Sequence, residues 1–206
     1  MIRCVILGAG EIKDSKEIRS YIRNDDYIVC ADGGLKHAEK MNLKINLTVG
    51  DFDSSDEPEN AQIIKLPVEK DITDTFACME KCIEKGYRDF LLLGCTGGRL
   101  DHFYANVLLL KYAFDNDCNA VIVNENNRIS IISENETRIK YDGYENVSFF
   151  AFMGEIENLT IENAKYNLSS HNLAQSDPLC ISNSFVNKGD IIIKKDSGLL
   201  LVIESN

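Results

Sequence analysis

Two aspartates separated by one residue are the feature of the sequence that most directly suggests chemistry. Asp51 and Asp53 stand in the segment Gly50-Asp51-Phe52-Asp53-Ser54, directly after the apolar run 47–49. In an extended segment, residues two apart point to the same side, so both carboxylates can face one cation. Two close carboxylates repel each other unless a metal ion or a proton lies between them. The pair indicates a metal site; the alternative is a polar turn in which Asp53 acts as a cap.

A second acidic group occurs in Lys70-Asp71-Ile72-Thr73-Asp74. An apolar stripe at residues 72, 76, 79 and 83 predicts a helix here, for which Asp71 can be the N-cap and Asp74 a favourable first-turn acid. That structural role explains either residue alone. Because the two aspartates are three residues apart, they can also share one helix face away from the stripe. We therefore expect a second carboxylate group near the first.

The segment Gly97-Gly98-Arg99-Leu100-Asp101-His102 combines two glycines with an arginine and an aspartate at the start of a second predicted helix. Arg99 suits bidentate contact with a phosphate, and Asp101 can be a helix-start acid. The apolar stripe of this helix is predicted at residues 100, 103, 107, 110 and 114. The earlier turn Gly8-Ala9-Gly10 lacks the third glycine of a dinucleotide-binding loop, because Lys13 occupies that position. No Walker lysine motif occurs, so a phosphate site must be of another type.

These motifs require elements that bring them together. Continuous apolar runs that alternate with helical patterns predict a mostly parallel α/β sheet with helices on both faces. The expected strands are residues 4–7, 27–31, 47–49, 63–66, 90–93 and 120–123. Each glycine or aspartate motif, including Asp32-Gly33-Gly34, follows one of these strands at or soon after its end. In a parallel sheet those ends lie on one edge, where open α/β sheets bind ligands.

The pattern changes near Asn124, after which no long amphipathic helix is found. Short segments punctuated by Asn, Asp and Gly predict a small antiparallel β domain, a sandwich or a barrel. The expected strands are residues 128–132, 147–152, 159–161, 180–185, 190–194 and 199–203. We therefore predict an α/β domain over residues 1–125 and a β-rich domain over residues 126–206.

Composition limits the partners and the compartment. The chain of 206 residues has a formal net charge of -11, which disfavours electrostatic binding to nucleic acid or to an anionic membrane surface. A small phosphorylated ligand remains compatible with this charge, since magnesium can bridge aspartates and phosphates. No targeting segment or membrane-spanning run is apparent. Seven cysteines without a CxxC pair are typical of buried free thiols in a reducing cytoplasm.

Taken in order, the motifs resemble the thiamine pyrophosphokinase family over nearly the whole chain. The matching segments are Asp32-Gly33-Gly34, Gly50-Asp51-Phe52-Asp53-Ser54, Asp71-Ile72-Thr73-Asp74, Gly98-Arg99-Leu100-Asp101-His102, Tyr166-Asn167-Leu168 and Ser182-Asn183. The resemblance implies an N-terminal α/β domain that binds ATP and a C-terminal β domain that helps bind thiamine. It also implies a homodimer whose active site is shared between two subunits, and attack of the thiamine hydroxyl on the β-phosphorus of ATP, so that AMP leaves.

The resemblance also implies roles for individual residues. Asp51, Asp53 and Asp74 are expected to bind magnesium, and Arg99 to contact phosphate. Residues that position the substrates or lie beside the phosphates are expected to be Asp32, Gly33, Asp71, Thr73, Gly97, Gly98 and Asp101. In the thiamine pocket the expected residues are Ser182, Asn183 and Tyr166. Tyr166 would replace the stacking tryptophan of eukaryotic members, because this chain has no tryptophan and a phenol ring also stacks on a cationic heterocycle.

Two other functions fit the same motifs. A related diphosphokinase that acts on a hydroxymethyl pterin or a similar heterocycle would keep the N-terminal site and differ only in the C-terminal pocket. A non-catalytic nucleotide-binding module is expected to lack part of the acidic set. All five aspartates at positions 51, 53, 71, 74 and 101 are present, which favours the enzyme.

Overall fold

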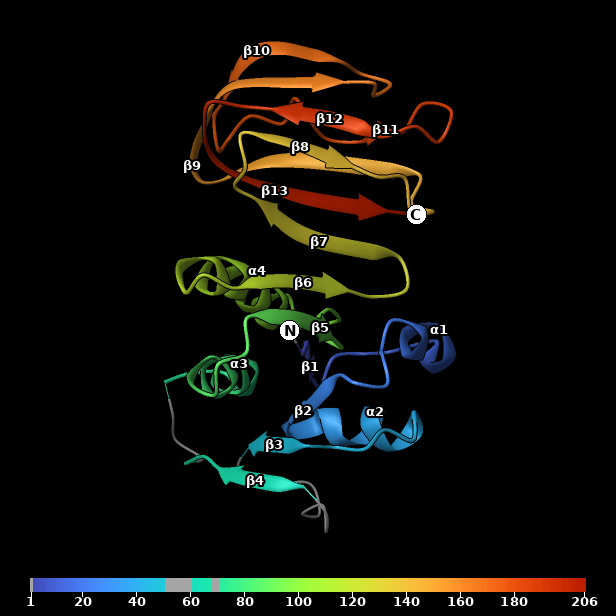
Figure 1. Ribbon diagram of the computed structural model, residues 1–206, viewed down its shortest axis with the longest axis vertical. Helices are drawn as coiled ribbons and strands as arrows, with labels where there is room; N and C mark the ends of the chain where they lie inside the picture. Colours follow the sequence, from blue (N-terminus) through green and yellow to red (C-terminus); the bar gives the residue numbers. More distant parts are fainter. Residues whose placement is uncertain (1, 51–60, 68–70) are drawn as a thin grey trace. The chain divides into compact units, whose positions relative to one another are not determined.

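A computed structural model describes residues 2–50, 61–67 and 71–206 (Figure 1). The chain divides into two compact units, Met1–Glu125 and Asn126–Asn206. The first contains parallel strands and helices, and the second contains only strands within the described residues. The prediction of a mixed α/β fold is confirmed.

The first unit is built on a parallel sheet with the strand order β4-β3-β2-β1-β5-β6. Its strands are β1 (Cys4–Leu7), β2 (Tyr27–Ala31), β3 (Leu47–Gly50), β4 (Gln62–Lys65), β5 (Asp89–Leu93) and β6 (Asn119–Val123). Each lies within one residue of its predicted range. Most of their side chains are buried, as the continuous apolar runs require. The chain order reverses between β1 and β5, which is the switch point where such sheets leave a crevice.

Helices cover both faces of this sheet. They are α1 (Ser15–Ser20), η1 (Asp32–Gly34), α2 (Leu35–Lys40), α3 (Asp74–Glu84) and α4 (Leu100–Asp115). Val5 and Leu7 of β1 pack in one core with Ile18 of α1 and Leu35 of α2. Cys4, which precedes Val5 in the strand, faces the other way, and its Sγ lies 3.4 Å from Sγ of Cys82 on α3. In the view of Figure 1, α1 and α2 lie to the right of the strands and α3 and α4 to the left.

Two predicted helical stripes begin differently in the structure. Ile72 precedes α3 and is exposed, because that helix begins only at Asp74. Leu100 is the first residue of α4 and is 74% exposed, and Phe114 near the other end is exposed as well. The buried face of α4 consists of Asn106, Val107, Leu109, Leu110 and Ala113. Both apolar stripes were therefore predicted too long. The first included a residue that precedes its helix, and the second included residues in the exposed terminal turns of α4.

The second unit contains two sheets that share one long strand, β9 (Asn146–Glu162). Its first half pairs with β13 (Ser197–Ser205) and β11 (Asn183–Ser184), and β13 pairs in turn with β7 (Asn127–Ile132). Its second half pairs with β12 (Ile191–Lys194) and β10 (Leu168–Leu173), and β12 pairs with β8 (Glu136–Ile139). Met153 and Gly154, both with positive φ, lie between Phe152, which pairs with β13, and Ile156, which pairs with β10. The unit is thus an antiparallel two-sheet arrangement around one apolar core.

Several strands of this unit differ from the sequence-based ranges. Segments 147–152 and 159–161 belong to the single strand β9, and segment 180–185 contains only the two-residue strand β11. Strands β8 and β10 were not predicted, because exposed polar residues dominate them. Arg128 of β7 forms a bidentate ion pair with the buried Glu204 of the neighbouring strand β13, at 2.5 and 2.6 Å.

All seven cysteines are free and buried, as predicted. Burial raises the pKa of the Cys30 and Cys95 thiols to about 12, so both are protonated at neutral pH. None of the helices in the described part of the chain combines the length and the apolar character that crossing a membrane requires.

Candidate active site

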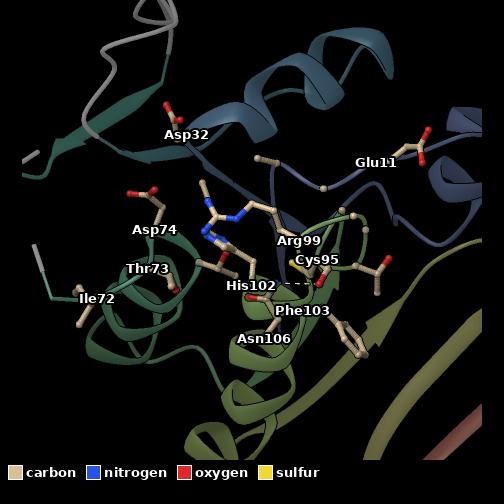
Figure 2. A pocket seen from close by; sticks show the side chains of 18 of the residues that line it. Glu11, Asp32, Ile72, Thr73, Asp74, Cys95, Arg99, His102, Phe103 and Asn106 are labelled. Atoms are coloured by element: carbon tan, nitrogen blue, oxygen red, sulfur yellow. Dashed lines mark hydrogen bonds between the residues drawn. The ribbon is translucent and has the colours of Figure 1, made fainter.

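A pocket of about 960 Å³ opens at the carboxyl edge of the parallel sheet, around the switch point between β1 and β5 (Figure 2). Five segments line it: the turns after β1, β2 and β5, the start of α3, and the N-terminal half of α4. The predicted residues that it brings together are Asp32, Asp71, Thr73, Asp74, Gly97, Gly98 and Arg99. The volume is typical of a site for a small-molecule ligand. These residues, which are distant in sequence, therefore share one cavity.

The turn after β2 places Asp32 at the pocket. Asp32 starts the short helix η1 with a φ of 35°, a conformation that is uncommon for a residue with a side chain. Gly34 packs against the backbone of β1, where a Cβ atom would lie 2.0 Å from the carbonyl oxygen of Leu7. Gly33 lies beside Ala9 of the neighbouring turn. The Asp-Gly-Gly sequence is thus needed for the chain to turn tightly against β1 and leave the carboxylate at the edge.

The start of α3 places two carboxylates and a hydroxyl at the pocket. Thr73 is the N-cap, and its Oγ1 accepts a hydrogen bond from the backbone N–H of Phe76 at 3.2 Å. Asp74 follows in the first helical turn. The expectation that Asp71 caps the helix is wrong, because Asp71 precedes the cap by two residues and is exposed. Asp71 and Asp74 line the same pocket, although they do not share a helix face.

The start of α4 presents Arg99 and Asp101. The Arg99 guanidinium donates to both oxygens of Asp101, at 3.3 and 2.5 Å, and both side chains are largely exposed. The hydrogen bond from Arg99 lowers the pKa of the Asp101 carboxyl to about 2, so this group is ionised at every physiological pH. The same pair raises the pKa of Arg99. Figure 2 shows Asp32, Asp74 and Arg99 around one open space.

Several pocket residues were not predicted from the sequence. They are Glu11, Phe103 and Asn106, together with His102; the glycine turns at residues 8–10 and 94–99 were predicted at this edge from the sequence. Asn106 is buried and donates from Nδ2 to the carbonyl oxygen of Cys95 at 2.9 Å. Asn106 thus acts on the backbone of a turn, and no spacing in the sequence indicates that role.

The described part of the pocket offers oxygen ligands for a metal ion. Asp32, Asp71 and Asp74 contribute carboxylates, whereas the thiol of Cys95 is protonated. Carboxylate oxygens are the ligands that magnesium prefers. Over residues 2–50, 61–67 and 71–206, no three His, Cys, Asp or Glu side chains gather as a complete metal site. Asp51 and Asp53, two of the three predicted ligands, lie outside the described residues.

The predicted thiamine-side residues lie together in the second unit. The side chain of Asn183, which is buried, accepts from the backbone N–H of Tyr166 at 3.0 Å and donates to its carbonyl at 2.8 Å. The Tyr166 ring is 59% exposed, with Lys165 Nζ 5.3 Å from its centroid. Ser182 has a φ of 57° and its backbone N–H donates to Oγ of Ser148. Asn183 therefore fixes the backbone that presents an exposed aromatic ring.

The first unit belongs to the class of open α/β proteins, which have a ligand-binding crevice at the carboxyl edge of a parallel sheet. Within that class, the chain belongs to the thiamin pyrophosphokinase family. The model of the thiamin pyrophosphokinase catalytic domain matches residues 18–122, and that of the vitamin B1 binding domain matches residues 126–200. The resemblance seen in the ordered motifs is confirmed.

Individual relatives agree with this assignment. Thiamine pyrophosphokinase of Bacillus subtilis (strain 168) is 32% identical over 165 residues, which is 76% of this chain and 76% of the relative. Among solved structures, thiamin pyrophosphokinase from Geobacillus thermodenitrificans has a TM-score of 0.85 at 27% identity, covering 100% of this chain and 98% of that one. The Bacillus subtilis structure has a TM-score of 0.88 at 24% identity with 99% coverage of both chains, which supports the fold alone.

Proposed function

We propose that this protein transfers a diphosphoryl group from ATP to the hydroxyl group of thiamine, giving thiamine diphosphate and AMP. The observation that carries this proposal is the match of both units, in order, to the catalytic and the vitamin B1 binding domains of one enzyme family. The pocket supports it, because carboxylates, an arginine and glycine-rich turns line one cavity at the switch point of the sheet. A hydroxymethyl pterin as substrate is not favoured, since the second unit matches a vitamin B1 binding domain.

The proposed reaction is an in-line displacement at the β-phosphorus. The thiamine hydroxyl oxygen forms a bond to that phosphorus, the bond to the bridging oxygen of the α-phosphate breaks, and AMP leaves with the electron pair. Catalysis of this kind is mainly positioning and charge stabilisation. Arg99, which directly precedes α4, and the first residues of α3 line the pocket and are suited to bind the phosphates. Gly97 and Gly98 allow the backbone to approach them closely.

The hydroxyl proton needs an acceptor or a group that orients it. Asp71 and Asp101, both expected to position the substrates, are the two candidates. The pKa of about 2 makes Asp101 a weak base, and its carboxylate already accepts two hydrogen bonds from Arg99. We therefore assign the proton-orienting role to Asp71, and to Asp101 the role of holding Arg99.

We propose magnesium as the metal ion, with Asp51, Asp53 and Asp74 as its ligands. The oxygen donors of the described pocket fit magnesium, and Asp74 stands at the start of α3 where it borders the cavity. A bound magnesium ion would neutralise charge on the β- and γ-phosphates during transfer.

A homodimer with a shared site is proposed on the basis of exposed apolar side chains. On α4, Leu100, Tyr104 and Leu108 are exposed and lie one helical turn apart. In the second unit, Tyr166 and Ile181 are exposed close to the predicted thiamine residues. Exposed apolar side chains grouped on one element are typical of an interface between proteins.

The seven buried free thiols fit a reducing compartment, for which we propose the cytoplasm.

The direct test is analysis of the products. Protein, magnesium, ATP and thiamine are incubated, and the nucleotides and thiamine esters are separated. We expect AMP and thiamine diphosphate to rise one for one, and no AMP to form without thiamine. Accumulation of ADP with thiamine monophosphate would overturn the proposal. Turnover of a hydroxymethyl pterin in place of thiamine would instead show that the protein is the related diphosphokinase.

A further inference from the structure

One wall of the pocket consists of two glycine-containing turns that contact each other mainly through backbone. Gly10 N–H donates to the carbonyl of Gly94 at 2.7 Å, and Gly8 N–H to that of Leu93 at 2.8 Å. A Cβ atom on Gly10 would lie 2.1 Å from the carbonyl oxygen of Thr96, far inside contact distance. We call the residues 8–10 and 94–97 the glycine wall. Because hardly any side chains interlock there, hydrogen bonds must set how the two turns lie against each other.

In addition to these backbone bonds between the turns, three side chains from outside the glycine wall form hydrogen bonds to one turn or the other. Asn106 on α4 donates from Nδ2 to the carbonyl of Cys95 at 2.9 Å. His37 on α2 has its Nε2 2.7 Å from the carbonyl oxygen of Gly10, and since a carbonyl only accepts, this nitrogen is the donor. Asn124, just after β6, donates from Nδ2 to Oγ1 of Thr96 at 2.9 Å. The turn at residues 94–97 is thus held by Asn106 of α4 and by Asn124, and the turn at residues 8–10 by His37 of α2.

We propose that Asn106 and His37 are positioning residues for the nucleotide: they hold the carbonyls of the glycine wall so that its backbone keeps the shape that ATP requires. The inference rests on the proposed function only in naming ATP as the ligand. Asn106 carries most of the effect, because its amide is buried and lies in the pocket wall itself. A buried donor that is removed leaves the Cys95 carbonyl without its bond and lets the turn move.

The sharpest test replaces Asn106 by aspartate, which has the same shape but no N–H. At neutral pH the introduced carboxylate faces the Cys95 carbonyl, oxygen against oxygen. We expect the affinity for ATP, measured by calorimetry without thiamine, to fall roughly tenfold or more. As the pH is lowered the introduced group becomes protonated and can donate, so the affinity relative to the unchanged protein should recover. A general packing defect gives no such recovery.

The same helix provides a matched control. Asn116 at the end of α4 also donates from Nδ2 to a backbone carbonyl, that of Tyr112, at 2.8 Å, but it lies outside the pocket lining. Asn116→Asp removes the same kind of bond and should leave the ATP affinity within about twofold of the starting value. An equal loss in both variants would overturn the proposal.

Substitutions of His37 provide a second, independent test. His37→Ala removes the donor to Gly10, whereas His37→Gln retains an N–H donor on a side chain of similar reach. We expect His37→Ala to raise the KM for ATP several-fold with little change in the KM for thiamine, and His37→Gln to restore part of the loss. Unchanged ATP affinity in both Asn106→Asp and His37→Ala, with folding checked by circular dichroism, would refute the inference. Normal ATP binding with no AMP production by the unchanged protein would instead contradict the proposed function.

Discussion

At the scale of single residues, the ion pair between Arg99 and Asp101 has a consequence for pH. The pKa of Asp101 is lowered from 3.8 to about 2 by the hydrogen bond from Arg99. The ion pair is therefore intact above pH 3.8 and is lost only as the pH falls through about 2. Asp101 therefore does not titrate in the range where the enzyme would work, and any acidic limb of the rate profile belongs to another group.

This predicts the behaviour of Asp101→Asn. The substitution removes the charge and one of the two acceptor oxygens that hold Arg99, and we expect kcat to fall on the order of tenfold or more, because a misplaced phosphate contact is costly. The shape of the pH–rate profile between about pH 5 and pH 9 should stay the same, since no titrating group has been removed. Initial rates across this range test it. If the variant loses an acidic limb that the unchanged protein shows, Asp101 does titrate there and the assignment of its role is wrong.

At the scale of elements, the ion pair between strands β7 and β13 of the second unit depends on one buried carboxylate. Glu204 on β13 accepts both bonds from Arg128 on β7, and Arg128 also pairs with Asp142 and lies 5.1 Å from the centroid of the Tyr144 ring. Removing one member of a buried pair leaves a poorly compensated charge. We expect Glu204→Ala to lower the free energy of unfolding by about 2–3 kcal/mol.

An exposed pair in the same unit serves as the control. Glu162 accepts from Lys194 at 2.9 Å, but both side chains are 44% exposed. Glu162→Ala should therefore cost less than about 1 kcal/mol. Urea unfolding of both variants gives the comparison. Equal costs would mean that burial of Glu204 contributes nothing, and that β7 and β13 are held by their backbone ladder alone.

The elements also show what could be predicted from the sequence. The parallel strands were predictable because they are buried on both faces and read as continuous apolar runs. The strand β9 was not, because the exposed residues Gly154, Glu155 and Glu157 interrupt its pattern where it passes between sheets. In the site, carboxylates, glycines and Arg99 were indicated by type and spacing. Asn106 and His37 were not, because each acts on a backbone carbonyl that comes close only after folding.

At the scale of the whole molecule, the proposed shared site can be tested by mixing variants. Arg99→Ala damages the first unit and Tyr166→Ala the second, so each homodimer has only damaged sites. If every site combines the first unit of one copy with the second unit of another, each heterodimer has one intact site. An equal mixture should then show about a quarter of the original activity at low thiamine concentration, because half of the dimers are heterodimers.

The control for this experiment is the state of association. Heterodimers must be shown to form, for example by capture of one tagged variant and detection of the other. No rescue in their presence would mean that both units of a site come from one copy, and the shared-site proposal would fail.

The glycine wall also bears on how the chain folds. Its two turns follow β1 and β5, which pair as Cys4 with Phe90 through Leu7 with Leu93, more than eighty residues apart in sequence. During synthesis β1 can pair with β2 long before β5 exists, so the wall is completed only when the sheet closes around its central strand. Such non-local pairing is slow to form. A nucleotide that needs the completed wall binds only the closed sheet, and at cellular concentrations it would draw the folding equilibrium of the first unit toward that state.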